Sequence, residues 1–482
     1  MATAQNGVFD LAEKPRAQGP CRGYRCNTDG RNYTVMTAVK EQTDHYFSTF
    51  SALEARRAQK GGSWFDVTRR QAMERFGELG FPTTRMENWK YTSVQPIARA
   101  TFKLAEFAKA KFSAQHLEGV KFGDKVSATL VFVNGFFVAS LSDLSRLPGN
   151  IAAGSLAGHL GSRMDGFEHH LAHYAPTDTQ AFIALNTAFL EDGVCLEIPT
   201  GTVLEKPIHV IHLTEPNGEP LMINQRTLIV AGRDVQAAVI ESYVGGEGAI
   251  YFSNGVTEIY LGENSSLEHA QIQQEGSKAF SISALHTHQE RSSRLLCHNV
   301  ALGAELVRND INCVMGGEGS ECTLNGLYQT GGRQHVDNHT LIDHAMPHCS
   351  SREYYKGVLD GQSTGVFSGS IVVRKDAQKT DAIQNNKNLL LSEDAVINTK
   401  PELQILADDV RCTHGATIGQ LDADAIFYMQ ARGIGKTAAR NLLTRAFAND
   451  VIGRVSFAPL RQRLEATLLE RLSKGWKAEE VL

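Results

Sequence analysis

The sequence predicts a mainly β protein, a right-handed parallel β-helix (solenoid) flanked by N-terminal and C-terminal α-helical segments. Between residues 191 and 420, short runs rich in Val, Ile, Leu, Thr and Tyr alternate with small turns such as Gly262-Glu263-Asn264. Helical periodicity is absent over that stretch, whereas apolar residues recur at helical spacing before and after it. The predicted layout is therefore helices, a long β middle and helices again.

The unequal spacing of the turns favours a solenoid over other all-β folds. Many short strands joined by small-residue turns also suit a sandwich or a propeller. The distance from turn to turn varies, so no strict repeat can be demonstrated. Since a solenoid tolerates coils of different length, we expect a parallel β-helix core over residues 191–420.

Composition limits the classes of function. With 482 residues, the chain is long enough for two or three structural units or one long repeating unit. The net charge of −5 argues against nucleic-acid binding, which needs a basic face to neutralise phosphates. No apolar run approaches the roughly 18–20 residues that span a membrane. The most apolar run, VFVNGFFVASL at 131–141, is interpreted as two strands around a turn.

The N-terminus and the cysteines indicate the compartment. Residues 1–35 are polar, contain Gly and Pro, and show no periodicity, so we expect a disordered tail. They carry neither a signal-peptide nor a transit-peptide pattern, and Met36 is an alternative start. The eight cysteines show no C-x-x-C spacing. Together these features predict a reduced, cytoplasmic setting.

Helices are predicted in both flanking regions. In the mixed N-terminal region, 36–190, the segment SWFDVTRRQAMERFGEL has helical spacing, with Ser63 as N-cap and Gly80 ending the helix. In the C-terminal region, 421–482, three helices are expected; they cover residues 422–432, 436–452 and 459–473.

The segment RGIGKTAAR at the second C-terminal helix resembles half of a phosphate-binding P-loop. A P-loop needs a further glycine at position 430, which is Gln430, and a preceding strand where this sequence predicts a helix. We therefore interpret it as a turn between two helices.

The run HVDNHTLIDHAMPHC at 335–349 concentrates metal-ligating residue types. If its first part is a strand, His335, Asp337 and His339 share one face. Imidazole and carboxylate suit Fe, Zn or Mn, so these three form a candidate half-site for a metal. The alternative is that polar side chains on the outside of a solenoid bind one another or water.

A second candidate lies in ADDVRCTHGATIGQ at 407–420. Cys412 and His414 are two residues apart, so on a strand they point the same way. Thiolates hold iron–sulfur clusters, and histidine can replace a thiolate there. Two ligands do not complete a tetrahedral site, so the remaining ligands must come from elsewhere in the chain or from a partner. The alternative is that both residues only pack.

Several longer phrases resemble the SufB/SufD family of SUF iron–sulfur cluster assembly proteins. They are RMENWKYT, DNHTLIDHAMPHCSSREYYKGVLDG, NNKNLLLSEDAVINTKPELQI, ADDVRCTHGATIGQLD and FYMQARGI. CTHGATIG is more similar to the SufD branch than to the SufB branch, and the resemblance extends over essentially everything from residue 36 onward.

The resemblance implies a β-helix and a non-enzymatic, accessory scaffold that pairs with SufB. It implies that the SufC ATPase docks on the C-terminal helices; the candidate docking residues are Phe427, Tyr428, Arg432, Gly433 and Ile434. His414 matches the family's interface histidine, a candidate cluster ligand opposite a SufB cysteine, and Cys412 is a weaker candidate. We expect no cofactor held stably by the isolated chain, and a transient Fe–S cluster or iron in the complex.

Three alternatives stay open. A homodimer through the β-helix is one alternative to the SufB heterodimer. A carbohydrate-active β-helix enzyme would need carboxylates or basic residues clustered on one exposed β-face. A stand-alone metal-binding protein would use residues 335–349.

Overall fold

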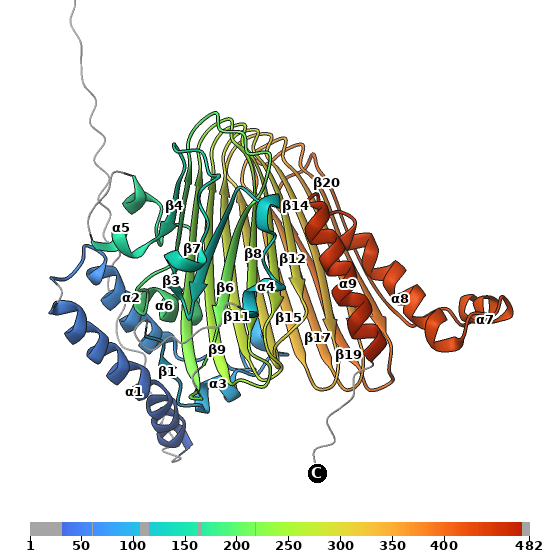
Figure 1. Ribbon diagram of the computed structural model, residues 1–482, viewed down its shortest axis with the longest axis horizontal. Coiled ribbons are helices and arrows are strands. Elements are labelled where there is room, and N and C mark those ends of the chain that lie inside the picture. Colours follow the sequence, from blue (N-terminus) through green and yellow to red (C-terminus); the bar gives the residue numbers. More distant parts are fainter. Residues whose placement is uncertain (1–30, 60, 107–114, 162–165, 217, 475–482) are drawn as a thin grey trace, which may run out of the picture.

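A computed structural model describes residues 31–59, 61–106, 115–161, 166–216 and 218–474. It confirms a mainly β chain built on a parallel β-solenoid of about 8 turns with helices at both ends (Figure 1). Of the predicted tail, residues 1–30 lie outside the described residues, and residues 31–35 belong to the first helix.

The strands form two 10-stranded sheets. Sheet A contains β1(Lys103–Leu104), β4(Ala152–Ser155), β5(Val194–Ile198), β7(Leu221–Ala231), β9(Tyr251–Leu261), β11(Phe280–Gln289), β13(Leu306–Met315), β15(His335–His344), β17(Thr364–Val373) and β19(Val396–Ile405). Sheet B contains β2(Ala128–Val133), β3(Phe136–Phe137), β6(Ile208–Thr214), β8(Gln236–Gly245), β10(Ser266–Gln274), β12(Arg294–Ala301), β14(Glu321–Thr330), β16(Ser350–Leu359), β18(Asp381–Leu390) and β20(Arg411–Gly419).

Successive strands alternate between the two sheets, so each coil adds one parallel strand to each sheet. The register pairs Phe280 with Leu306 but Thr364 with Val396, so the coils differ in length, as the irregular turns indicated. The antiparallel pairs are β2–β3 and β4–β5 at the start of the solenoid. The pair β2–β3 confirms the two strands expected around the turn in 131–141.

The interior between the sheets is filled mainly by aliphatic and aromatic side chains, including Ile259, Leu285, Val307, Leu324 and Phe367. These inward-facing residues alternate with outward-facing ones, as the two-residue period of a strand requires. Burial of this continuous apolar row is the main source of stability for the coil stack.

N-terminal helices cover the outer face of sheet A. The main helices are α1(Arg31–Ala58), α2(Asp66–Leu79), α3(Gln95–Arg99) and α6(Ala181–Ala188), with the short elements η1(Glu87–Trp89), α5(Ala157–Gly161) and η5(Phe167–His169). Phe76 and Phe182 from these helices pack in one cluster with Phe252 and Phe280 of the sheet. The short elements α4(Gln115–Glu118), η3(Gly123–Lys125) and η4(Ala139–Leu141) instead lie beside strands of sheet B.

The predicted N-cap at Ser63 is wrong, because α2 begins at Asp66. The carboxylate of Asp66 accepts the backbone N–H of Ser63 at 2.6 Å, and the hydroxyl of Ser63 accepts from the N–H of Phe65 at 3.1 Å. These local side-chain bonds hold residues 63–65 in a turn before the helix. The predicted end is confirmed, since Gly80 follows α2 with a φ of 61°.

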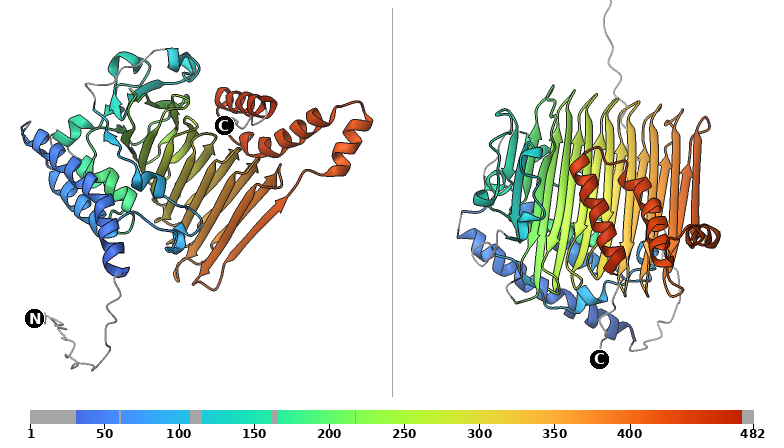
Figure 2. Two further views of the ribbon diagram at one scale, coloured as in Figure 1. Left: turned by 90° about the horizontal axis from the view of Figure 1, so that it is seen from below. Right: turned by 45° about the vertical axis from the view of Figure 1, so that its right-hand side comes forward.

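The C-terminal helices lie against sheet B and then extend away from it. Figure 2 shows them on a different side of the solenoid from the N-terminal helices. α8(Lys436–Ile452) and α9(Ala458–Lys474) pack on the sheet through residues such as Val451, Leu464 and Leu468. α7(Ala423–Ala431) is capped by the side chain of Asp422 and projects outward (Figure 1).

The segment RGIGKTAAR forms a turn between α7 and α8, as predicted, and not a P-loop. Gly433 has a φ of 85°, and Gly435 is the N-cap residue of α8. Across the described ranges, no helix has both the length and the apolar character needed to cross a bilayer.

Candidate functional site

The C-terminal end of the solenoid is open. β19 is the last strand of sheet A and β20 the last strand of sheet B, and each pairs with one neighbour within the described residues. A strand edge of this kind presents backbone N–H and C=O groups to another chain. We define the open end as the inward-facing residues of these two strands, which are Ile397, Thr399, Pro401, Leu403, Ile405, Cys412, His414, Ala416 and Ile418.

The open end leaves apolar side chains in contact with solvent. In earlier coils the inward-facing residues are covered by the next coil, as Phe367 and Ile371 are. The side chains of Ile405 and Ile418 at the open end are 40% and 51% exposed. Exposed apolar surface is common where a protein binds another chain.

Cys412 and His414 both lie in the open end on β20, as predicted from their spacing. His414 pairs with Gln384 of β18 and is exposed. Cys412 pairs with Ala382 and packs partly into the apolar cluster around Ile371. Burial raises the pKa of the Cys412 thiol, and the carboxylate of Asp381 raises it further. Because metals bind the thiolate, Cys412 must give up a proton that is held more firmly than usual.

The structure brings His335, Asp337 and His339 together on the outer face of β15, as the alternation predicted. Asp337 is buried, and its Oδ2 accepts from Arg308 Nη1 at 2.7 Å and from Thr92 Oγ1 at 2.5 Å. His339 Nε2 lies 3.1 Å from Asp337 Oδ1, and His335 Nε2 lies 2.9 Å from the Thr92 hydroxyl.

The carboxylate of Asp337 forms an ion pair with Arg308 of the same protein. Burial opposes the charge of Asp337, but Arg308 and His339 hold the pKa of its carboxyl well below the usual range. Within the described parts of the chain, no three His, Cys, Asp or Glu side chains are arranged to hold a metal ion. The arrangement matches the alternative reading, in which the polar side chains of 335–349 bind one another.

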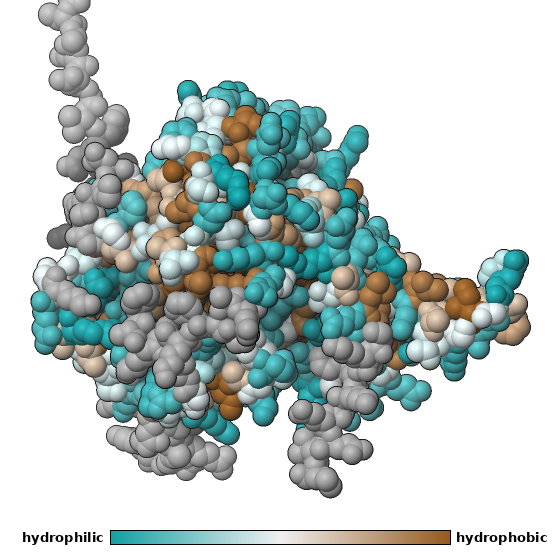
Figure 3. Space-filling view, viewed as in Figure 1, coloured by the Kyte–Doolittle hydropathy of each residue, from teal (hydrophilic) through white to brown (hydrophobic). Residues whose placement is uncertain are grey.

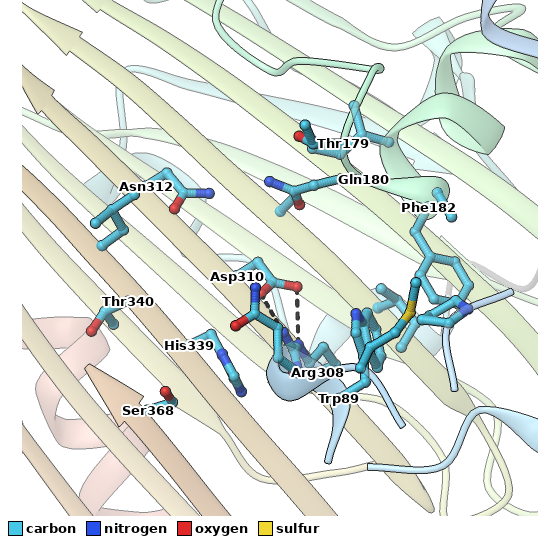
Figure 4. A pocket seen from close by; sticks show the side chains of 18 of the residues that line it. Trp89, Thr179, Gln180, Phe182, Arg308, Asp310, Asn312, His339, Thr340 and Ser368 are labelled. Carbon is cyan, nitrogen blue, oxygen red and sulfur yellow. Dashed lines mark hydrogen bonds and ion pairs between the residues drawn. The ribbon is translucent and has the colours of Figure 1, made fainter. Parts of the chain in front are cut away.

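Beside this network lies a cavity of about 460 Å³ between the N-terminal segment and the outer face of sheet A (Figure 4). Trp89 forms one wall, with the guanidinium of Arg308 4.1 Å from its ring centre. Arg308 also donates to both oxygens of Asp310, at 2.7 and 3.0 Å. Lys400 lies 2.9 Å from Glu87 and 3.7 Å from Glu402.

The charges that line this cavity are therefore paired within the protein. A carbohydrate-active enzyme of the usual type needs two carboxylates that are available as acid and base or nucleophile. Asp310 and Glu402 both have basic partners, so the cavity does not favour that alternative.

The predicted docking residues at the C-terminus form an exposed arm. Phe427 and Tyr428 of α7 are 72% and 60% exposed. Arg432 donates to the hydroxyl of Tyr428 at 2.9 Å and lies over its ring. Figure 3 shows hydrophobic residues along this projecting arm at the right of the molecule. Leu442 of α8 is also exposed. The sequence analysis missed it as a surface residue because its helical spacing is the same as that of a packed leucine.

Comparison with known proteins places two matches along the chain. Residues 40–210 match the SufBD protein N-terminal region, and residues 212–447 match the SufBD core domain of SUF system FeS cluster assembly. An iron–sulfur cluster assembly SufBD family protein of Synechocystis is 36% identical over 422 residues, which cover 83% of this chain and 89% of the relative.

Two further relatives match over most of their length. The iron–sulfur cluster assembly protein SufD of Escherichia coli is 26% identical over 407 residues, covering 84% of this chain and 92% of the relative. Protein ABCI7, chloroplastic, of Arabidopsis thaliana is 29% identical over 330 residues, covering 67% and 69%. The resemblance inferred from the motifs is thereby confirmed.

Proposed function

Because the chain belongs to the SufBD family of SUF iron–sulfur cluster assembly proteins, we propose that it is an accessory scaffold subunit that pairs with SufB and docks the SufC ATPase. In this proposal a nascent cluster forms at the interface between the two solenoids. The chain has no turnover of its own, and the cluster or iron is cargo that the isolated chain does not retain. The proposed location is the cytoplasm, although one relative carries the name chloroplastic.

The open end carries this proposal. Two edge strands and a set of exposed or half-buried inward-facing side chains meet there, with Ile405 and Ile418 as its exposed large apolar members. A second solenoid that places its own last strands against β19 and β20 would bury this row and satisfy the edge backbone groups. A homodimer would use the same end, so SufB and a second copy compete for it.

His414 is the proposed ligand from this chain. It is exposed, it lies in the row that the partner would cover, and a neutral imidazole is a good ligand for iron. A single exposed imidazole is an incomplete coordination shell, which suits a site that is finished by a cysteine of the partner. Cys412 is the weaker candidate because burial disfavours its thiolate.

The exposed arm supports docking of SufC. Phe427 and Tyr428 project from α7 into solvent, and Arg432, Gly433 and Ile434 follow them in the turn. Exposed aromatic side chains on a projecting helix have little value for folding and are typical anchors of a protein interface.

The proposal is tested by anaerobic co-expression of the chain with SufB and SufC, read by complex mass and visible absorption. We expect His414→Ala to lower the cluster yield while the complex still assembles. His169→Ala is the matched control, since His169 is exposed in η5 at the other end of the solenoid. An unchanged yield with His414→Ala removes His414 from the mechanism. A stable cluster on the chain purified alone contradicts the shared site and favours a stand-alone metal-binding protein.

A further inference from the structure

One row of inward-facing side chains leads from the buried core to the open end. The register pairs Glu353 of β16 with Gln384 of β18, and Gln384 with His414 of β20. Residues paired in register on neighbouring parallel strands point to the same side, about 4.8 Å apart. Glu353 and Gln384 are fully buried, so His414 is the first member of this row to reach solvent.

The amide of Gln384 has a defined orientation. Its Nε2 donates to Glu353 Oε2 at 2.6 Å, which directs the NH2 group toward the core. Gly369 on the opposite side of the interior leaves room for this amide, because a Cβ there would lie 2.4 Å from Gln384 Nε2. The side chain is therefore closely packed as well as hydrogen-bonded.

The carbonyl oxygen of the same amide has no hydrogen-bond partner among the described residues. This atom, Gln384 Oε1, is buried. Buried carbonyl oxygens in folded proteins usually accept a hydrogen bond, so this oxygen can take a further donor. The next side chain along the row is His414, whose ring carries such a donor when neutral.

We propose that Gln384 is a positioning residue for His414. No hydrogen bond joins the two side chains in this structure; when the exposed ring of His414 turns inward, the carbonyl oxygen of Gln384 accepts its inner ring N–H, and the outer nitrogen faces the partner with a free lone pair. A histidine that binds a metal usually donates its other ring N–H to a carboxylate or carbonyl, which fixes both the tautomer and the orientation of the ring. Glu353 acts one step behind, by holding the amide of Gln384. The relevance of this contact to cluster assembly rests on the proposed function of His414.

The contact is tested first on the isolated full-length chain, by NMR of ring nitrogens after labelling with ¹⁵N-histidine. The His414 signals are assigned by their loss in His414→Ala. We expect one tautomer in the wild type and a mixture in Gln384→Met, which keeps the shape of the side chain and removes the carbonyl. The same tautomer distribution in both proteins overturns the inference.

The second measurement is cluster formation in the complex with the partner chain. Loss of a side chain that supports a metal ligand typically costs about 10-fold or more in affinity or activity, and we expect a loss of that size in Gln384→Met. The double variant Glu353→Gln with Gln384→Glu exchanges donor and acceptor and keeps an acceptor oxygen next to His414. It is expected to recover most of the cluster formation.

Gln289→Met is the matched control. Gln289 is a fully buried glutamine of β11 whose Nε2 donates to the backbone oxygen of Glu321 at 2.9 Å, several coils from the open end. Its loss is expected to lower stability without changing cluster formation. Equal losses of cluster formation in Gln384→Met and Gln289→Met reduce Gln384 to a structural role and overturn the inference.

Two further outcomes are separated by this design. If Gln384→Met does not fold, two other variants take its place: the double variant, and Gln384→Asn with its shorter side chain. Both are measured for the tautomer of His414 and for cluster formation. If His414→Ala leaves cluster formation intact, the proposed role of His414 as a ligand fails, while the tautomer measurement still decides whether Gln384 holds His414.

Discussion

Thr92 and Asp337 are 245 positions apart in the chain, yet Thr92 Oγ1 donates a 2.5 Å hydrogen bond to Asp337 Oδ2. This contact ties the N-terminal segment that contains Trp89 to β15 in the middle of the solenoid. The same carboxylate holds Arg308, whose guanidinium packs on Trp89. The N-terminal region is therefore fixed to sheet A by a buried ionic network as well as by apolar packing.

Asp337→Asn is expected to destabilise the protein by about 3 kcal/mol or more. The change leaves the buried Arg308 with only Asp310 as a charged partner, and removing one member of a buried ion pair costs roughly 3–5 kcal/mol. Urea unfolding measures the effect. The control is Asp409→Asn, because Asp409 pairs with Lys379 on the exposed surface and is expected to contribute little. Equal effects of the two changes contradict the role assigned to the network.

The contribution of Glu353 to stability should fall as pH rises from about 4.5 to about 7. Burial raises the pKa of this carboxyl from its ordinary value of 4.5 to about 7, although the Thr340 hydroxyl and the Gln384 amide lower it in part. Between the two pKa values the unfolded chain releases the proton and the folded chain keeps it, so ionisation favours unfolding. The contribution is on the order of 3 kcal/mol, fully present below pH 4.5 and lost above pH 7.

The variant Glu353→Gln isolates this effect from other groups. Burial lowers the pKa values of His209, His286 and His344, which makes stability rise with pH and acts in the opposite direction. We expect the variant to lose only the component due to Glu353, measured as the difference in unfolding free energy between the two proteins from pH 4.5 to 8. A difference that does not change with pH rules out a raised pKa at Glu353.

Leu464→Ala should loosen the C-terminal helices from sheet B. Leu464 is buried in the cluster that joins α9 to Val300 and Leu327, and truncating a buried leucine costs about 2–5 kcal/mol. Leu469→Ala is the matched control on the same helix, since Leu469 is among the exposed residues. Hydrogen exchange of α9 is expected to rise in the first variant and stay near wild type in the second. Unchanged exchange in both means that α9 is held by other contacts.

Ile418→Asp should block pairing at the open end while leaving the isolated chain folded. The side chain is half exposed, so a carboxylate there remains hydrated in the free protein but would be buried unpaired against a second solenoid. Val203→Asp places the same charge on an exposed residue near the start of the solenoid and is expected to pair normally. The mass of the complex with SufB measures both variants. Normal pairing of Ile418→Asp locates the interface elsewhere.

Local sequence patterns predicted helices and strands well where the spacing of residues within one short segment is enough to define them. The period of two residues gave the strands and placed Cys412 and His414 on one side of β20, and helical spacing gave α8 and α9. The N-cap at Ser63 failed because its hydroxyl accepts the N–H of Phe65 and its own N–H donates to the side chain of Asp66, which holds residues 63–65 in a turn before the helix; the spacing of apolar residues does not show such local bonds.

The sequence by itself determined the family, the alternation of strands and turns, and the residue types that suit iron. Only the tertiary structure decided that Asp337 belongs to Arg308, that β19 and β20 end the stack, and that Gln384 lies directly behind His414. The physical reason is register. The coils are not all of one length, so which side chains become neighbours depends on the length of every turn and on the packing of the whole interior, and not on any single segment.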